Sequence, residues 1–100
     1  MALVNLMIVK HGEKGARSTI IGTHVRTARG LLRKAEKLAS KYSSKDGQKK
    51  ADVYIFDHKK DRKEIPPNLV FWTPQELYAE EGLEGIAEVV KDAQGVDLLI

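Results

Sequence analysis

Residues 23–42 read THVRTARGLLRKAEKLASKY, and this stretch decides how the rest of the chain folds around it. Its apolar residues recur every three or four positions, which places them on one face of an α-helix because successive helical residues turn by about 100°. These residues are Val25, Ala28, Leu31, Leu32, Ala35, Leu38, Ala39 and Tyr42. The spacing predicts an amphipathic helix from about Thr23 to Tyr42, with Thr23 near its start.

A strand is expected before this helix. Leu3–Val9 is an almost continuous apolar run, the pattern of a strand covered on both faces. A polar loop, Lys10–Arg17, follows it. The next segment, Ser18–Gly22, is ambiguous because β-branched residues favour a strand while Ile21 also falls on the apolar arc of the helix. We favour a short strand in a hairpin with the first; the alternative is a helix that begins near Ser18.

Three further strands are predicted after the helix, together with a second helix. The strands are Val53–Phe56, Leu69–Trp72 and a closing strand at Val96–Ile100. The second helix begins at Thr73–Glu76, where a capping threonine precedes a proline and is followed three residues later by glutamate. It ends at Gly95, and two glycines predict a break or kink near Glu81.

These elements predict a single α/β (α+β) domain spanning residues 1–100. The expected architecture is a compact two-layer sandwich with a mostly antiparallel sheet of four to five strands and two main helices. The order is ββαββαβ if the Ser18–Gly22 strand forms. Without that strand it is βαββαβ, the order of the ferredoxin-like sandwich.

Composition narrows the classes of protein to which the chain can belong. One hundred residues with 42% apolar and 31% charged side chains suit one ordinary globular domain. No cysteine is present, which excludes disulfides and thiolate chemistry and suits a reducing compartment. No stretch approaches the roughly 20 apolar residues that span a bilayer. We expect a cytoplasmic protein with no membrane partner.

Charge is distributed unevenly along the chain. Residues 10–63 hold 16 Lys and Arg against 6 Asp and Glu, a net charge of +10, whereas residues 64–100 hold 1 against 8, a net charge of −7. Residues 1–9 carry none, so the total is +3. This asymmetry indicates an anionic partner for the first part, neutralisation of one part by the other, or head-to-tail association.

The outer face of the 23–42 helix carries the best functional signal. Like charges four residues apart, such as Arg29 and Arg33, destabilise a helix by about 0.2–0.5 kcal/mol per pair, and an anionic partner would offset that repulsion. Phosphates of a nucleic acid fit this role. The candidate nucleic-acid-binding residues are Arg26, Arg29, Arg33, Lys34, Lys37 and Lys41, with Lys14 and Arg17 from the preceding loop.

Other interpretations of the same face stay open. A basic helix face is at least as often simply solvated. Glu80, Glu84 and Glu88 form an acidic stripe on the second helix, which would partly neutralise the first helix if the two lie side by side. A protein–protein module or inhibitor would dock this face on an acidic protein surface or would self-assemble, for example as a homodimer.

Catalysis has thinner support. An enzyme acting on a small anionic substrate would need His11, His24 and Asp57 to converge in one pocket, and the Asp57, His58 and Asp61 group is equally explained as a charged loop. We predict no catalytic residue, no metal site and no cofactor. The sequence therefore favours a small non-enzymatic binding or regulatory protein whose basic helix engages an anionic macromolecule, with DNA or RNA as the first candidate.

Overall fold

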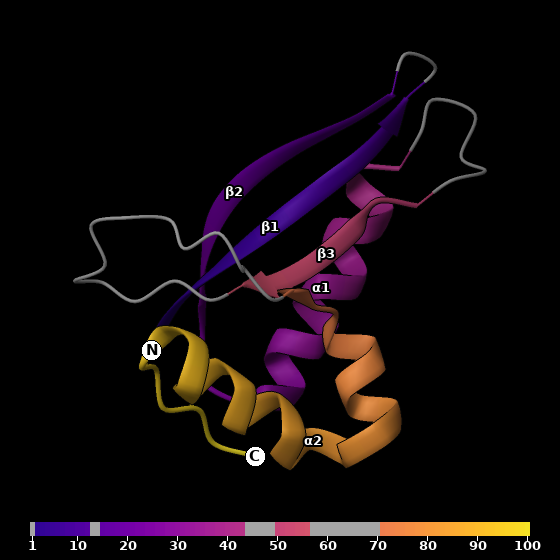
Figure 1. Cartoon of the computed structure of the whole chain (residues 1–100). Helices are drawn as coiled ribbons and strands as arrows, with labels where there is room; N and C mark the ends of the chain where they lie inside the picture. The colour runs from indigo at the N-terminus through magenta and orange to yellow at the C-terminus, as the bar shows by residue number, and fades with distance from the viewer. Residues whose placement is uncertain (1, 13–14, 44–49, 57–70) are drawn as a thin grey trace.

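The computed structural model describes residues 2–12, 15–43, 50–56 and 71–100. These residues form an antiparallel sheet with spatial order β2-β1-β3-β4 and two helices that pack against one of its faces (Figure 1). The elements are β1 (Ala2–Gly12), β2 (Gly15–Val25), α1 (Ala28–Lys41), β3 (Asp52–Phe56), β4 (Phe71–Trp72) and α2 (Pro74–Gln94). The predicted compact α+β architecture is confirmed.

The sheet is smaller than predicted. Three strands of at least five residues make up most of it, and β4 adds two residues beside β3. Leu69 and Val70, the first half of the predicted strand there, lie outside the described residues. The predicted count of four to five strands is therefore not confirmed.

The ambiguous Ser18–Gly22 segment is part of a long hairpin. β1 and β2 pair from Ala2 opposite Val25 to Gly12 opposite Gly15. Gly15 has a φ of 120°, a conformation that glycine adopts at little steric cost. The strand interpretation is confirmed, and the alternative of a helix from Ser18 is wrong.

α1 begins five residues later than predicted. Its N-cap is Thr27, whose Oγ1 accepts a hydrogen bond of 2.9 Å from the backbone N–H of Gly30. Thr23, which was expected near the helix start, is buried on β2. The predicted start was wrong because Val25 fits both the helical repeat of about 3.6 residues and the strand repeat of two. It would lie on the apolar face of the helix, and it also lies on the inward-facing side of β2.

The second helix matches the prediction at its start, its kink and its end. Thr73 caps it by accepting a 3.2 Å hydrogen bond from the N–H of Glu76. Gly82 is non-helical, with φ 74° and ψ −165°, which divides α2 into two segments. Gly95 ends it in the left-handed conformation, with φ 69°. Within the described part of the chain, no helix is long and apolar enough to cross a membrane.

The predicted closing strand is wrong. Residues 96–100 add no strand to the sheet, and Leu99 instead forms one parallel bridge with Thr27. The Leu99 carbonyl accepts from Ala28 N–H at 2.7 Å, and the Leu99 N–H donates to the Arg26 carbonyl at 3.1 Å. The chain end is thus attached to the β2–α1 connection. The described order is ββαββα, so neither the ferredoxin-like order nor ββαββαβ is observed.

The core lies between the sheet and the helices. Alternate residues of β1, Val4, Leu6 and Ile8, are fully buried and meet Leu31 of α1 and Ile86 of α2 in one cluster. Alternation along a strand explains this, since every second side chain points to the same face.

A side-chain amide joins α2 to the sheet. The Gln94 Oε1 accepts from Asn5 N–H at 2.9 Å, and the Gln94 Nε2 donates to the carbonyls of Asn5 at 2.8 Å and Phe56 at 3.2 Å. Gln94 is only 8% exposed. Its side chain therefore connects the end of α2 to the backbones of both β1 and β3.

Candidate functional site

The predicted basic helix face exists and is open to solvent. All of its predicted cations are exposed: Arg26, Arg29, Arg33, Lys34, Lys37 and Lys41. Arg26 is not on the helix as predicted, because it precedes the Thr27 N-cap and lies on the β2–α1 connection. Arg29, Arg33, Lys37 and Lys41 follow one another at intervals of four residues and form a row along α1. Because four residues of α-helix rise about 6 Å, this row is about 18 Å long. The buried face of α1, centred on Leu31 and Ala35, points the opposite way into the core.

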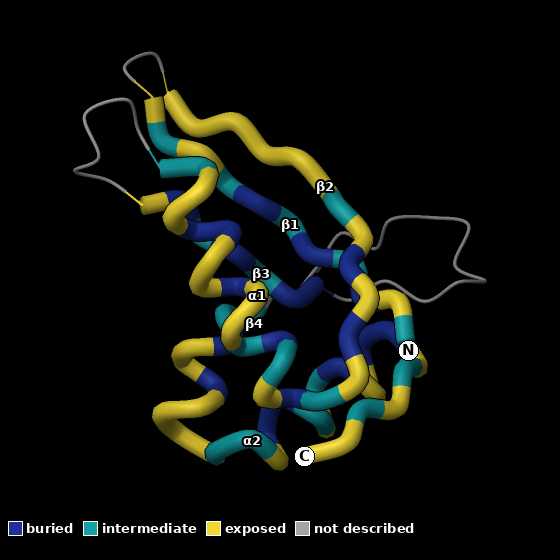
Figure 2. The backbone as a smooth tube through the Cα atoms, turned by 180° about the vertical axis from the view of Figure 1, so that it is seen from behind, coloured by how far each residue is buried: buried dark blue, intermediate teal, exposed yellow. Residues whose placement is uncertain are grey.

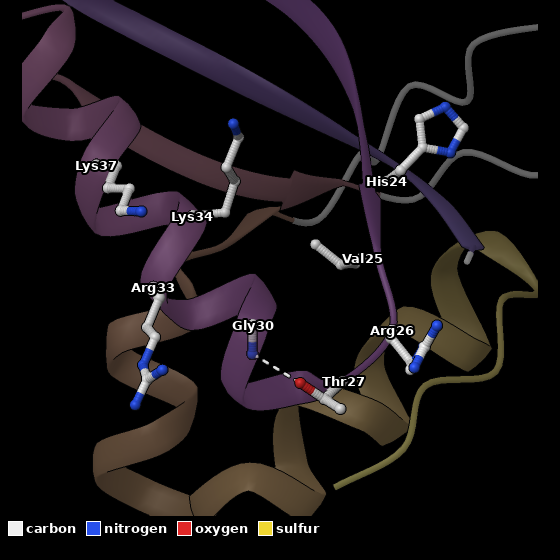
Figure 3. A pocket seen from close by; sticks show the side chains of 8 residues that line it. All are labelled: His24, Val25, Arg26, Thr27, Gly30, Arg33, Lys34 and Lys37. Atoms are coloured by element: carbon white, nitrogen blue, oxygen red, sulfur yellow. Dashed lines mark hydrogen bonds between the residues drawn. The ribbon is translucent and has the colours of Figure 1, made fainter.

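A shallow groove of about 380 Å³ lies where the end of β2 meets the flank of α1 (Figure 3). Its lining contains four cationic side chains and no carboxylate, so its chemistry suits an anion. The lining residues are His24, Val25, Arg26, Thr27, Gly30, Arg33, Lys34 and Lys37.

The basic residues of α1 form no ion pair with Glu80, Glu84 or Glu88 of α2 in the part of the chain that the structure describes. Among the described residues, ion pairs join His11 to Asp52 and Lys91 to Asp97, and none involves a cation of α1. The stripe residues Glu80, Glu84 and Glu88 are themselves exposed. Neutralisation of one helix by direct ion pairs with the other, one of the sequence interpretations, is therefore not observed in this part of the chain.

A second basic cluster adjoins the C-terminal end of α1. The Lys10 Nζ lies 4.5 Å from the centre of the Tyr42 ring, and the Lys41 Nζ lies 5.5 Å from it, so two cations contact one aromatic ring. The predicted residue Arg17 is exposed and lies directly opposite Lys10 in the hairpin. Lys14, also predicted, lies outside the described residues.

Sequence reasoning missed Lys10 and Tyr42 as members of this surface. Lys10 was assigned to a loop, and Tyr42 was counted only as part of the apolar helix face. The signal that would have placed them is the hairpin register. Once Gly12 and Gly15 are paired, Lys10 stands on the same sheet face as Ile8, and therefore on the side of α1.

His11 and His24, the two histidines that the structure describes, do not lie in one site. His11 is paired with Ala16 and His24 with Leu3, so they lie at opposite ends of the hairpin, eight positions and about 26 Å apart along β1. The His11 Nε2 instead contacts the Asp52 Oδ2 at 2.7 Å. Asp57, His58 and Asp61 lie outside the described residues. Within the described ranges, no group of three or more His, Asp or Glu side chains is arranged to hold a metal ion.

One phenol near His11 and Asp52 is electrostatically perturbed. Tyr54 and Asp52 are two residues apart on β3, so their side chains point to the same face of the sheet. Burial, together with the negative charges of Asp52 and Glu76, raises the pKa of the Tyr54 phenol above its ordinary value of 10.0. The neutral phenol is therefore favoured at this position, which does not suit a general base.

Comparison of the chain with protein-family models, with curated proteins and with solved structures finds no significant match. The geometry of the basic surface is therefore the basis for assigning a function to this chain.

Proposed function

We propose that this chain is a small non-enzymatic binding or regulatory protein that engages an anionic macromolecule through the outer face of α1, with nucleic acid as the first candidate. The observation that carries the proposal is a row of exposed cations, from Arg29 to Lys41, with no ion-pair partner among the described residues. The proposal includes a cytoplasmic location, and a chain without cysteine suits such a reducing compartment.

The physical basis is release of counterions from the phosphate backbone. Each phosphate neutralised by a Lys or Arg frees a condensed cation, so binding strengthens steeply as salt is lowered and is largely independent of base sequence. The row offers contacts to phosphates, which position a protein on a nucleic acid but carry no information on base sequence. Arg29, Arg33, Lys37 and Lys41 are expected to contribute most.

The test is fluorescence anisotropy with labelled random-sequence DNA and RNA over a series of salt concentrations. The variant Arg29→Ala/Arg33→Ala removes two cations while keeping high helix propensity. A matched control, Gln75→Glu/Ala79→Glu, alters exposed residues of α2 and lowers the net charge from +3 to +1, as the first variant does.

We expect the α1 variant to bind about tenfold more weakly near physiological salt and to lose about 1.8 from the slope of log K against log salt, because about 0.9 is lost per phosphate contact. The control should retain the wild-type slope. Equal loss in both variants would show that only net charge matters. Absence of binding by folded wild-type protein even at low salt would refute the nucleic-acid proposal.

The alternative partner is an acidic protein surface, which includes the acidic stripe of a second copy. Glu80, Glu84 and Glu88 are exposed and form no ion pair within the described ranges, which favours a second copy as the acidic partner. Sedimentation of the chain alone over a salt series separates the two: association that disappears in Arg29→Ala/Arg33→Ala, without any nucleic-acid binding, would favour self-assembly. A small enzyme comes third, because His11 and His24 are far apart.

A further inference from the structure

We propose that the anionic partner is double-stranded nucleic acid, held between α1 and the outer part of the β1–β2 hairpin. This inference rests on the proposed function and names its substrate class. It follows from three observations: the basic surface has two walls, it carries no aromatic ring free to stack on a base within the described residues, and its cations on α1 are attached at regular intervals along a helix.

The first wall is the exposed row on α1, and the second is the hairpin beyond the core. Along β1 the inward positions end at Ile8, and Lys10 is the next residue on that face. Directly opposite it is Arg17 on β2. From Gly15 to Ile20 every residue of β2 is exposed, although Ile8, which lies opposite Thr19, is buried (Figure 2). This outer strand of the hairpin is therefore open to solvent beside the part of β1 that belongs to the core.

The two walls meet at Tyr42. Its ring is contacted by the Lys10 Nζ from the hairpin at 4.5 Å and by the Lys41 Nζ from α1 at 5.5 Å. The basic row on α1 therefore continues, through Lys41, onto Lys10 and Arg17 of the hairpin. One wall is a helix and the other is a two-stranded ribbon (Figure 1).

Single-strand binders combine a basic groove with aromatic rings on which unpaired bases stack. Tyr42 is partly buried and its ring is already occupied by two ammonium groups. The other described aromatic side chains lie elsewhere. Tyr54 points to the face of the sheet opposite the buried Val53 and Ile55. Trp72 packs against the core, and Tyr78, which is 51% exposed, is on α2. The surface thus offers contacts to a backbone and none to splayed bases.

The regular spacing at which α1 carries the side chains of its cations also favours a duplex. Successive members of the α1 row are about 6 Å apart on a rigid helix. A duplex presents one phosphate charge per about 1.7 Å of axis and holds its phosphates in place, whereas a single strand has a lower charge density and must lose flexibility to match the row. A stiff row of cations therefore gains more from the duplex.

The experiment compares a labelled duplex with each of its own single strands, at matched length and over a salt series, using the full chain. We expect the duplex to bind about tenfold more tightly or better, with a slope near −0.9 per contact. Arg17→Ala should reduce that slope by about 0.9 and Lys10→Ala/Arg17→Ala by about 1.8. Gln75→Glu/Ala79→Glu is again the control.

The single variant Arg17→Ala controls for a loss of folding, because it leaves the contact between Lys10 and the Tyr42 ring intact and changes only an exposed side chain. Single strands that bind as tightly as the duplex, with the α1 row still required, would overturn the duplex inference and leave the proposed function standing. A slope unchanged in Arg17→Ala would remove the hairpin from the interface and refute the two-walled arrangement. Failure to bind either form would overturn the proposed function itself.

Discussion

The Gln94 amide is predicted to be a major source of stability, and Gln94→Met isolates its contribution. Methionine keeps the length and most of the packing of glutamine but removes all three hydrogen bonds to Asn5 and Phe56. Each such bond contributes about 0.5–1.5 kcal/mol net, so the expected loss is about 3 kcal/mol. That is a large fraction of the roughly 5–15 kcal/mol that stabilises a small domain.

The assay is urea unfolding followed by circular dichroism. With an m-value of about 1–3 kcal/mol/M, a loss of 3 kcal/mol lowers the midpoint by about 1–3 M. Gln75→Met is the matched control, because Gln75 is on the same helix but exposed, and such surface changes stay within about 0.5 kcal/mol. If the two variants unfold at the same urea concentration, the three hydrogen bonds do not stabilise the fold as argued.

Three further predictions concern caps, backbone conformation and pH. Thr27→Ala removes the cap of α1 and should lower the unfolding free energy by about 1 kcal/mol, measured by the same urea assay; no change would mean that another group caps the helix. Gly95→Ala should destabilise by about 1–2 kcal/mol because its φ of 69° is left-handed, although a Cβ there meets nothing within 4 Å; stabilisation would contradict a purely conformational cost. The raised pKa of Tyr54 stabilises the fold below its unfolded value of 10.0, and that stability is lost as pH rises towards the folded pKa. Tyr54→Phe should flatten this alkaline loss in unfolding free energy, and an unchanged pH profile would argue against it.

The basic surface was predictable where helical geometry alone places the side chains. From Arg29 to Lys41, a spacing of four residues puts the cations on one row, and the apolar residues between them fix which face is buried. The contribution of the hairpin was not predictable in the same way. Lys10 and Tyr42 are 32 positions apart, and their contact depends on the register of β1 against β2 and on the packing of α1.

The start and kink of α2 were determined by the sequence itself, because Thr73, Pro74 and Glu76 act within one helical turn and Gly82 acts on its own backbone. The start of α1 and the end of the chain were decided only by tertiary structure. Val25 suits a helix or a strand, and pairing with Ala2 selects the strand. Residues 96–100 have strand composition, yet a strand needs a partner edge, and the backbone groups available to Leu99 were those of the β2–α1 connection. Local signals act through neighbouring residues, whereas pairing partners are supplied by distant parts of the chain.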